Sequence, residues 1–325
     1  MLRRAVLTTL LSFAATAVLA PAAFAQELPP GPVRMQVGFA AGGSTDAMAR
    51  IIAEKLSERI GRSIVVENNA GASGRLAAET VKKAAPDGST LLVGNIGMVV
   101  LAPVTFKTLS YNPLTDFEPV ARAADFQMAL AAAPVTGAKD VAGFVAWMKA
   151  NPDKANMAVP LQASLSHLTA LRFVEAAGIK SEMVIYRGTA LAMQDLLSGR
   201  LPGSAAAVAD FAEQHRAGTL KVLAVSGTKR STALPDVPTF GEAGMKGFEG
   251  NGWNGFLLPA GTPKAIVERY NREILDIVRQ PDVEARLAQL GFVVPEPHTP
   301  AEFAATIKAG QDSWRPLVKA AGLEQ

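Results

Sequence analysis

Apolar residues along this chain recur at two spacings, which predict strands that alternate with helices. A short apolar strand is expected over residues 33–39. From Thr45 to Ile60 the apolar positions lie on one helical face, and Gly61 follows as a stop signal. The same order then repeats, with a strand at 63–67, a helix at 74–84 and a strand at 90–94. A β-α-β-α-β series of this kind predicts a parallel sheet with right-handed crossovers.

A second series of alternating elements begins near Phe126. Its expected strands lie at 127–133, 155–159, 183–186, 203–209 and 220–225, and its helices at 140–150, 166–177 and 191–197. The last third is mostly helical, with helices expected at 262–279, 281–290 and 300–321. Two α/β series without a low-complexity linker predict two lobes, each a mostly parallel sheet flanked by helices, with a cleft between them.

The first 25 residues have the pattern of a secretory signal peptide. Arg3 and Arg4 precede a mostly apolar stretch over 5–20, and Ala23-Phe24-Ala25 fits an A-x-A cleavage motif. We therefore expect cleavage after Ala25 and a mature chain in the periplasm. The alternative is an N-terminal membrane anchor, which the short apolar stretch disfavours because a membrane span needs more residues.

Composition narrows the range of partners and cofactors. The sequence holds 32 basic and 29 acidic residues, and removal of residues 1–25 leaves 30 basic residues, so the mature net charge is +1. This balance does not favour nucleic acid as a partner. The sequence contains no Cys, which excludes disulfides and thiolate chemistry. His167, His215 and His298 lack metal-ligand spacing, so we expect neither a metal nor another cofactor.

The segment Val37–Leu56 carries the strongest local signal for a ligand. A glycine-rich loop, Gly42-Gly43-Ser44-Thr45-Asp46, joins the first expected strand directly to the first helix. Unpaired N–H groups at the start of such a helix, with the positive end of the helix dipole behind them, form an anion site without Arg or Lys. The alternative is a tight βα turn with Ser44 or Thr45 as the N-cap. The spacing does not match a nucleotide-binding P-loop.

Two patterns that are typical of enzymes do not fit this chain. Gly250–Gly255 matches G-x-G-x-x-G, but it leads into the strand-like stretch 256–259 and not into a helix, which argues against a dinucleotide site. The sequence has no G-x-S-x-G elbow, so an exported ester hydrolase lacks its nucleophile signature. These absences argue against an enzyme and leave the exported hydrolase as a remote alternative.

Beyond these motifs, the mature chain resembles one family over nearly its whole length. The matching segments are Val37–Asp46 with Arg50, Val66–Asn68 with Gly71 and Gly74, Ala85–Gly88, Asp116–Val120, Ser166–Leu168, Tyr186–Gly188, Leu223–Val225, Leu234–Thr239 with Glu242–Gly244, and Pro259–Pro263. In order and spacing they resemble the extracytoplasmic solute receptors of the tripartite tricarboxylate transporter system, the Bug (TctC-like) family. The resemblance implies a type II periplasmic binding protein, a Venus flytrap with lobe 1 at 26–127 and 228–325 and lobe 2 at 128–227.

The resemblance also implies a ligand, partners and a site. The ligand is a small organic carboxylate held mainly by backbone amides and water, and a receptor that we expect to be a monomer presents it to inner-membrane permease subunits. The family's contacts map onto Phe39, Ala41, Gly42, Gly43, Ser44, Thr45 and Asp46; Asn95, Ile96 and Gly97; Gln162, Ala163, Ser164 and His167; and Tyr186, Arg187 and Gly188.

Three places depart from the family pattern. Ala41 stands where Pro is usual, the loop 159–164 lacks the common serines and glycines, and Ala206-Ala207 stands where Asp or Asn is frequent. Lobe 2 therefore offers few polar groups to a second buried carboxylate. We predict a monocarboxylate with an apolar or aromatic body, although Arg187 as a counterion would favour a diacid. The alternative role is a ligand-sensing receptor for a two-component sensor kinase, which the sequence does not separate from transport.

Overall fold

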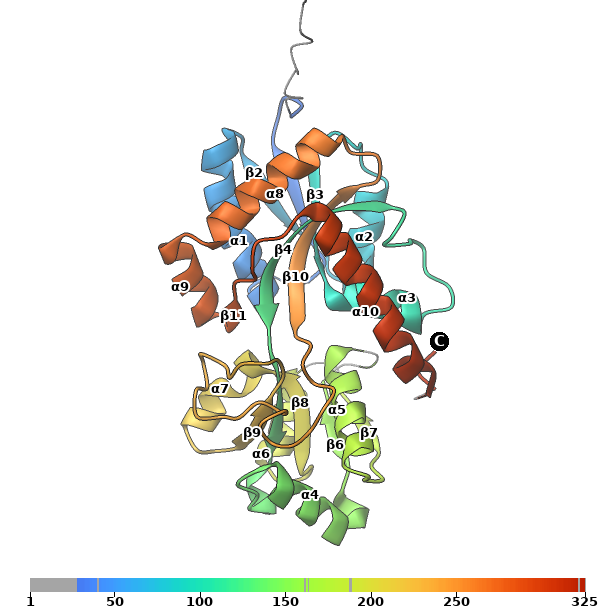
Figure 1. Ribbon diagram of the computed structural model, residues 1–325, viewed down its shortest axis with the longest axis vertical. Coiled ribbons are helices and arrows are strands. Elements are labelled where there is room, and N and C mark those ends of the chain that lie inside the picture. The colour runs from blue at the N-terminus through green and yellow to red at the C-terminus, as the bar shows by residue number, and fades with distance from the viewer. Residues whose placement is uncertain are drawn as a thin grey trace, which may run out of the picture.

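Figure 1 shows the computed structural model of the protein, which describes residues 28–39, 41–160, 162, 164–186, 189–320 and 322–324. The predicted signal peptide therefore lies outside the described residues. The chain forms two lobes, one above the other in this view, joined by extended segments. Within the described ranges, no helix has the length and apolar character that a membrane span requires.

Lobe 1 is built on a six-stranded sheet in the order β11-β4-β10-β3-β1-β2. The strands are β1 (Val33–Val37), β2 (Ile64–Asn68), β3 (Thr90–Asn95), β4 (Phe117–Phe126), β10 (Gly252–Pro259) and β11 (Phe292–Val293). Neighbours pair in register, with Met35 of β1 opposite Val66 of β2 and Leu91 of β3. The carboxyl ends of β1 and β3 therefore lie at the same edge of the sheet.

Helices cover both faces of this sheet. They are α1 (Ser44–Ile60), α2 (Arg75–Lys82), α3 (Ala102–Thr105), α8 (Lys264–Val278), α9 (Pro281–Gln289) and α10 (Pro300–Ala320). Alternate strand residues face opposite sides, so Phe256 packs with Met48 and Ile274 of α1 and α8, whereas its neighbour Leu257 packs with Ile307 of α10. This two-sided burial explains why the strands of lobe 1 read as nearly continuous apolar runs.

Lobe 2 repeats the plan with a five-stranded sheet in the order β7-β6-β8-β5-β9. Its strands are β5 (Met128–Ala132), β6 (Met157–Val159), β7 (Met183–Ile185), β8 (Gly203–Ala207) and β9 (Lys221–Val225), and its helices are α4 (Val141–Ala150), α5 (Leu165–Ala176), α6 (Thr189–Leu197) and α7 (Val208–Arg216). Phe144 and Phe173 stack at 5.8 Å between ring centroids under one face. Phe211 of α7 is buried under the other face.

The two-lobed α/β fold is confirmed, but both sheets are mixed and not mostly parallel. In lobe 1, β1 pairs parallel with β2 and β3, whereas β10 runs antiparallel to β3 and β4, and β11 antiparallel to β4. In lobe 2, β5 runs antiparallel to β8 and β9. The physical reason is the crossing of the chain, because β4 leads out of lobe 1 straight into β5 and β10 returns in the opposite direction.

Two segments cross between the lobes. The outgoing one is short, since β4 ends at Phe126 and β5 begins at Met128. Between them, the Gln127 side-chain amide donates to the carbonyl oxygens of Ser226 and Lys229, at 2.6 and 2.8 Å, and so ties the outgoing segment to the chain after β9.

The stretch 228–251, which we expected in lobe 1, packs on lobe 2. Leu234 and Val237 join the core around α7, and Phe240 and Phe248 join the core around α5. We therefore propose that the returning crossing lies just before β10, near Asn251, and that lobe 2 extends to about that residue.

Candidate functional site

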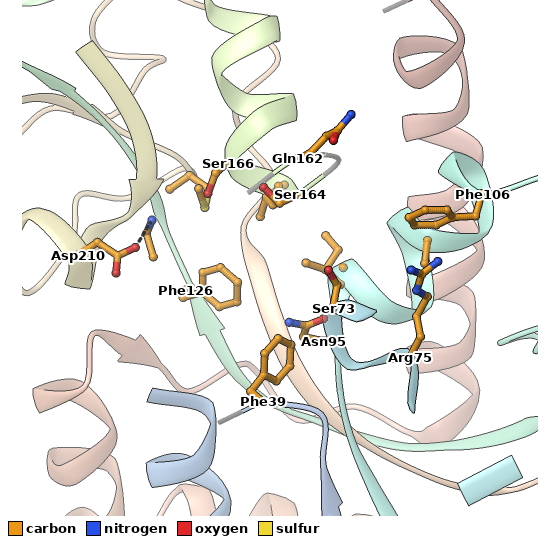
Figure 2. Close-up of a pocket in the computed structure, with 16 residues that line it drawn as sticks. Phe39, Ser73, Arg75, Asn95, Phe106, Phe126, Gln162, Ser164, Ser166 and Asp210 are labelled. Carbon is orange, nitrogen blue, oxygen red and sulfur yellow. Dashed lines mark hydrogen bonds between the residues drawn. The ribbon is translucent and has the colours of Figure 1, made fainter. Parts of the chain in front are cut away.

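Two adjoining cavities lie between the lobes, with volumes of about 190 and 370 Å³. Residues of both lobes line them, and Figure 2 shows the side chains around the smaller one. The residues shared by the two cavities are Phe39, Asn95 and Phe126 from lobe 1 strands or their ends, and Ser164, Ser166, Ala207 and Asp210 from the starts of lobe 2 helices. The cavities are therefore one interlobe cleft, placed where strands end and helices begin.

The start of α1 contributes to the larger cavity through Ser44 and Thr45. Gly42 has φ of 84°, a left-handed conformation that suits glycine, and it turns the chain from β1 towards the helix. Because α1 begins at Ser44, the N–H groups of its first turn have no acceptor inside the helix. The cleft thus meets the positive end of a 17-residue helix, as the anion-site prediction requires.

The Asp46 side chain is buried and points into the protein, so it is not placed to contact a ligand in the cleft. Its carboxylate accepts from the Gly42 amide at 2.9 Å, from Asn68 at 2.8 Å and from Arg50 at 3.0 Å, and the residue is only 3% exposed. Burial by itself raises the pKa of Asp46, but these donors outweigh it and lower the pKa to about 2. The Asp46 side chain therefore fixes the loop. Gly42 turns the chain, but its amide already donates to Asp46 and is not available to a ligand.

The end of β3 supplies a second lining segment, which contains the predicted site residues Asn95, Ile96 and Gly97. Asn95 lines both cavities, and Ile96 and Gly97 line the smaller one. The Asn95 side-chain oxygen accepts from the Met98 amide at 3.0 Å, which fixes the turn that follows β3. Beside it, Asn254 of β10 is 1% exposed, lies 3.4 Å from the Thr45 hydroxyl between oxygen atoms, and lines the larger cavity.

In lobe 2, the start of α5 lies against the cleft. Ser164 is the N-cap of this helix and accepts from the amide of His167 at 3.3 Å. Gln162, Ser164 and Ser166 line the cleft, whereas the His167 side chain is buried within the lobe and is not among the lining residues described. Burial lowers the pKa of His167, so its imidazole is neutral at physiological pH.

The expected contacts around Tyr186 are only partly described. The Tyr186 hydroxyl donates to Asp195 at 2.5 Å, and burial together with this carboxylate raises the pKa of Tyr186 to about 12. The Tyr186 hydroxyl is therefore bonded to a residue of α6 and does not point a free donor into the cleft. Ala163, Arg187 and Gly188 lie outside the described residues. Ala41 and Gly43 belong to the loop before α1 and do not line the described cavities.

The comparison with known families shows to which family the chain belongs. The sequence model described as "Tripartite tricarboxylate transporter family receptor" matches residues 48–323. The chain belongs to this receptor family. Among relatives, protein BugT of Bordetella pertussis is 31% identical over 311 residues, which cover 95% of each chain. The UPF0065 protein in the tcbD-tcbE intergenic region of Pseudomonas sp. strain P51 is 34% identical over 291 residues, 89% of this chain and 86% of the relative.

Solved receptor structures share the fold over almost the whole described chain. The periplasmic binding protein BugD is 35% identical with a TM-score of 0.78, covering 91% of this chain and 99% of BugD. MatC from Rhodopseudomonas palustris with bound malate is 33% identical with a TM-score of 0.77, covering 90% of this chain and 100% of MatC. A further R. palustris protein, Rpa4515 with adipate, is 30% identical with a TM-score of 0.80, covering 90% and 98% of the two chains.

Several residues of the receptor's cleft were not found from the sequence. Arg75 lines the smaller cavity, with its guanidinium carbon 3.9 Å from the centroid of the Phe106 ring and its Nε donating to the Ala72 carbonyl at 2.8 Å. Before it, Ala72 and Ser73 have positive φ values of 46° and 58°, an uncommon conformation in a loop that places Ser73 at the cleft.

Asp210 is the other charged residue that sequence reasoning missed. It lies in the first turn of α7 and lines both cavities. Burial raises the pKa of Asp210 to about 6, and a hydrogen bond from the Ala207 amide at 3.2 Å lowers it only in part. The signal that would have revealed Asp210 was the start of α7, which we expected to be the end of a strand.

Proposed function

We propose that this receptor captures a small organic monocarboxylate with an apolar or aromatic body in the cleft between its lobes. The single observation that carries the proposal is the larger cavity, which is lined by Ser44 and Thr45 at the start of α1 and by residues of both lobes. The N–H groups of that helix start, with the helix dipole, provide donors for one carboxylate. Ligands bound between two lobes stabilise the closed form through contacts that only that form makes.

The lining of the rest of the cleft supports an apolar ligand body. Away from α1 the lining is mixed. Its apolar side chains include Phe39, Ile96, Phe106, Phe126, Met128, Leu165, Ala207, Ala209, Leu290 and Phe292, and its polar ones include Ser73, Arg75, Asn95, Gln162, Ser164, Ser166, Thr189, Asp210 and Asn254. A second carboxylate against the apolar side chains would be desolvated without donors, which is costly, and the Nε of Arg75 is already bonded to the Ala72 carbonyl. The printed ligands of the related R. palustris structures, malate and adipate, are both dicarboxylates, so this proposal separates the present receptor from those two relatives.

Capture is followed by delivery to the inner-membrane permease subunits of a tripartite transporter. The family of transport receptors and the predicted signal peptide, cleaved after Ala25, support a mature receptor that works in the periplasm, and we propose that it acts as a monomer. Binding and release of an unchanged ligand require no catalytic group, no cofactor and no nucleic acid.

The test is a thermal-shift screen of organic acids followed by calorimetry on matched pairs. A ligand at 100 times its dissociation constant stabilises the protein by about 2.7 kcal/mol, so binders are detected as a rise in melting temperature. We expect caproate to bind more tightly than adipate, and benzoate more tightly than terephthalate. Equal affinity within the pairs, or tighter binding of the diacids, would contradict the monocarboxylate assignment. Failure of every acid in the screen would contradict carboxylate capture itself.

A further inference from the structure

The cleft carries opposite charges on its two lobes. Lobe 1 presents the positive start of α1 at Ser44 and Thr45, together with the Arg75 guanidinium. Lobe 2 presents the carboxylate of Asp210. Figure 2 shows Asp210 and Arg75 at opposite ends of the drawn set, with Phe126, Phe39 and Asn95 between them in this view.

The Asp210 carboxylate is free to take a ligand group. One of its oxygens accepts from the Ala207 amide, and among the described residues no other hydrogen bond and no ion pair reaches it. A helix cap of this kind uses one oxygen, and the second oxygen has no donor from those residues. Asp210 is partly buried and lines the cleft, so its second oxygen is within reach of a ligand and would pair with a group that supplies a donor.

The position of Asp210 also changes what the start of α7 can bind. The first turn of a helix attracts anions, and in a two-lobed receptor this one would suit a second ligand carboxylate. Here the protein's own carboxylate lies in that turn. A diacid would bring a like charge next to Asp210 in a partly desolvated cleft, where the repulsion is large.

From this arrangement we propose that the ligand is an amino acid of extended shape, with its carboxylate at the start of α1 and a protonated amine at Asp210. Asp210 is thus the residue that selects for the cationic end and against diacids. The inference rests on the proposed function, because it assumes that α1 holds the carboxylate. The observation that supports the inference is the larger cavity, because Ser44, Thr45 and Asp210 line the same space. The ring of Phe126 lines that space as well and offers an aromatic face to a cation. Such a ligand would bridge the lobes by its two charges and so favour closure.

The test compares three ligands of each chain length on the full mature protein by calorimetry. The cationic members are γ-aminobutyrate, δ-aminovalerate and ε-aminocaproate. Their uncharged counterparts are butyrate, valerate and caproate, and their diacid counterparts are succinate, glutarate and adipate. In the wild type we expect the best amino acid to bind at least about tenfold more tightly than its alkanoate, and the diacid of that length to bind most weakly.

The variant Asp210→Asn separates charge from helix capping, because the asparagine oxygen still accepts the Ala207 amide. We expect this variant to lose about tenfold in affinity for the amino acid, to gain affinity for the diacid and to leave the alkanoate unchanged. The control is Asp282→Asn, which removes an exposed carboxylate from the first turn of α9 and should change none of the three affinities.

The outcomes distinguish the two proposals. Equal binding of amino acid and alkanoate in the wild type, or an amino acid affinity that Asp210→Asn leaves unchanged, would overturn the role of Asp210 while monocarboxylate capture stands. If no member of the three series binds, the proposed function fails together with this inference. The wild-type comparison decides the case even if Asp210→Asn does not fold.

Discussion

Single residues give the loop before α1 its shape. Asp46 is buried beneath it, and its carboxylate is bonded to the Gly42 amide, to Asn68 and to Arg50. Gly43 has an extended backbone, with φ of −74°, that any residue can adopt. The backbone conformation at Gly43 therefore does not require glycine.

Replacing Asp46 with asparagine should destabilise the protein in a pH-dependent way. The folded pKa of Asp46, about 2, is below its ordinary value of 3.8, so its contribution is complete above about pH 4 and is lost as the pH falls towards 2. We expect Asp46→Asn to lower the free energy of unfolding by about 2 kcal/mol at pH 7. Urea unfolding at pH 7 and pH 3 measures the gap in unfolding free energy between the wild type and the variant. The gap should narrow at pH 3, and the exposed control Asp312→Asn should cost below about 0.5 kcal/mol.

A larger side chain at Gly43 should abolish ligand binding and spare the fold. Its extended φ accepts valine, whose methyl groups would cover the approach to the first amides of α1. We expect Gly43→Val to lose binding by at least about tenfold, and Gly43→Ala to lie between it and the wild type. Calorimetry gives the affinities and circular dichroism checks the fold. Undiminished affinity in a folded Gly43→Val protein would show that this loop is not the carboxylate site.

Among the elements, β10 links the fold to the cleft. Gly252 of β10 lies opposite Phe126 of β4, and a Cβ at this glycine would be 2.2 Å from the Phe126 ring. The ring can therefore rest directly on the β10 backbone. It also meets Phe292 of β11 edge to face, at 6.4 Å between centroids, and lines both cavities. The strand that returns from lobe 2 thus sets the position of an aromatic wall of the cleft.

The variant Gly252→Ala should consequently affect ligand affinity as well as stability. The added methyl group would displace the Phe126 ring, at a cost of about 1–3 kcal/mol in unfolding free energy. We expect the affinity for the best acid to fall by about tenfold. The control Gly250→Ala lies two residues away, where a Cβ has no neighbour within 4 Å, and should change neither quantity. If Gly252→Ala binds the acid as tightly as the wild type, the position of the Phe126 ring does not matter for ligand binding, and the prediction is wrong.

The elements that the sequence predicted are those with a strong local pattern. β1 and α1 were found because an apolar run, a glycine turn and a helical stripe follow one another from Val33 to Ile60. β4 and α7 were missed. The run from Ala205 to Val208 is apolar throughout, so its periodicity does not show where β8 ends and α7 begins.

The same limit applies to the candidate site. Ser44 and Thr45 were predicted because they lie where a glycine-rich loop joins a strand to a helix, and Asn95 was predicted from the family resemblance. Phe126, Arg75 and Asp210 come from separate elements, and only the packing of those elements brings them to one cleft. A short stretch of sequence does not show that these residues lie close together in the fold.

At the scale of the whole molecule, the lobes are held together by a small set of contacts beside the cleft. Gln127 of the outgoing segment bonds to the chain after β9, and the Arg172 guanidinium of α5 lies 4.8 Å from the ring centroid of Trp314 on α10. α5 belongs to lobe 2 and α10 to lobe 1. Crossing segments of a few residues allow rotation about one region, as in hinge closure around a ligand.

Ligand binding should therefore make the molecule more compact. In small-angle X-ray scattering we expect the radius of gyration to decrease when a saturating acid is added, because the ligand's contacts with both lobes favour the closed form. The control is a matched primary amide, which lacks the carboxylate and should leave the scattering curve unchanged. An unchanged radius with a fully bound acid would contradict closure.

The central claim is that the start of α1 holds a ligand carboxylate within the interlobe cleft. A crystal structure of the protein with the tightest acid from the screen tests it most directly. The account predicts carboxylate oxygens within about 3 Å of amide nitrogens in the first turn of α1, around Ser44 and Thr45, with the rest of the ligand against Phe39 and Phe126. A carboxylate bound only in lobe 2, or a ligand outside the cleft, would contradict the account.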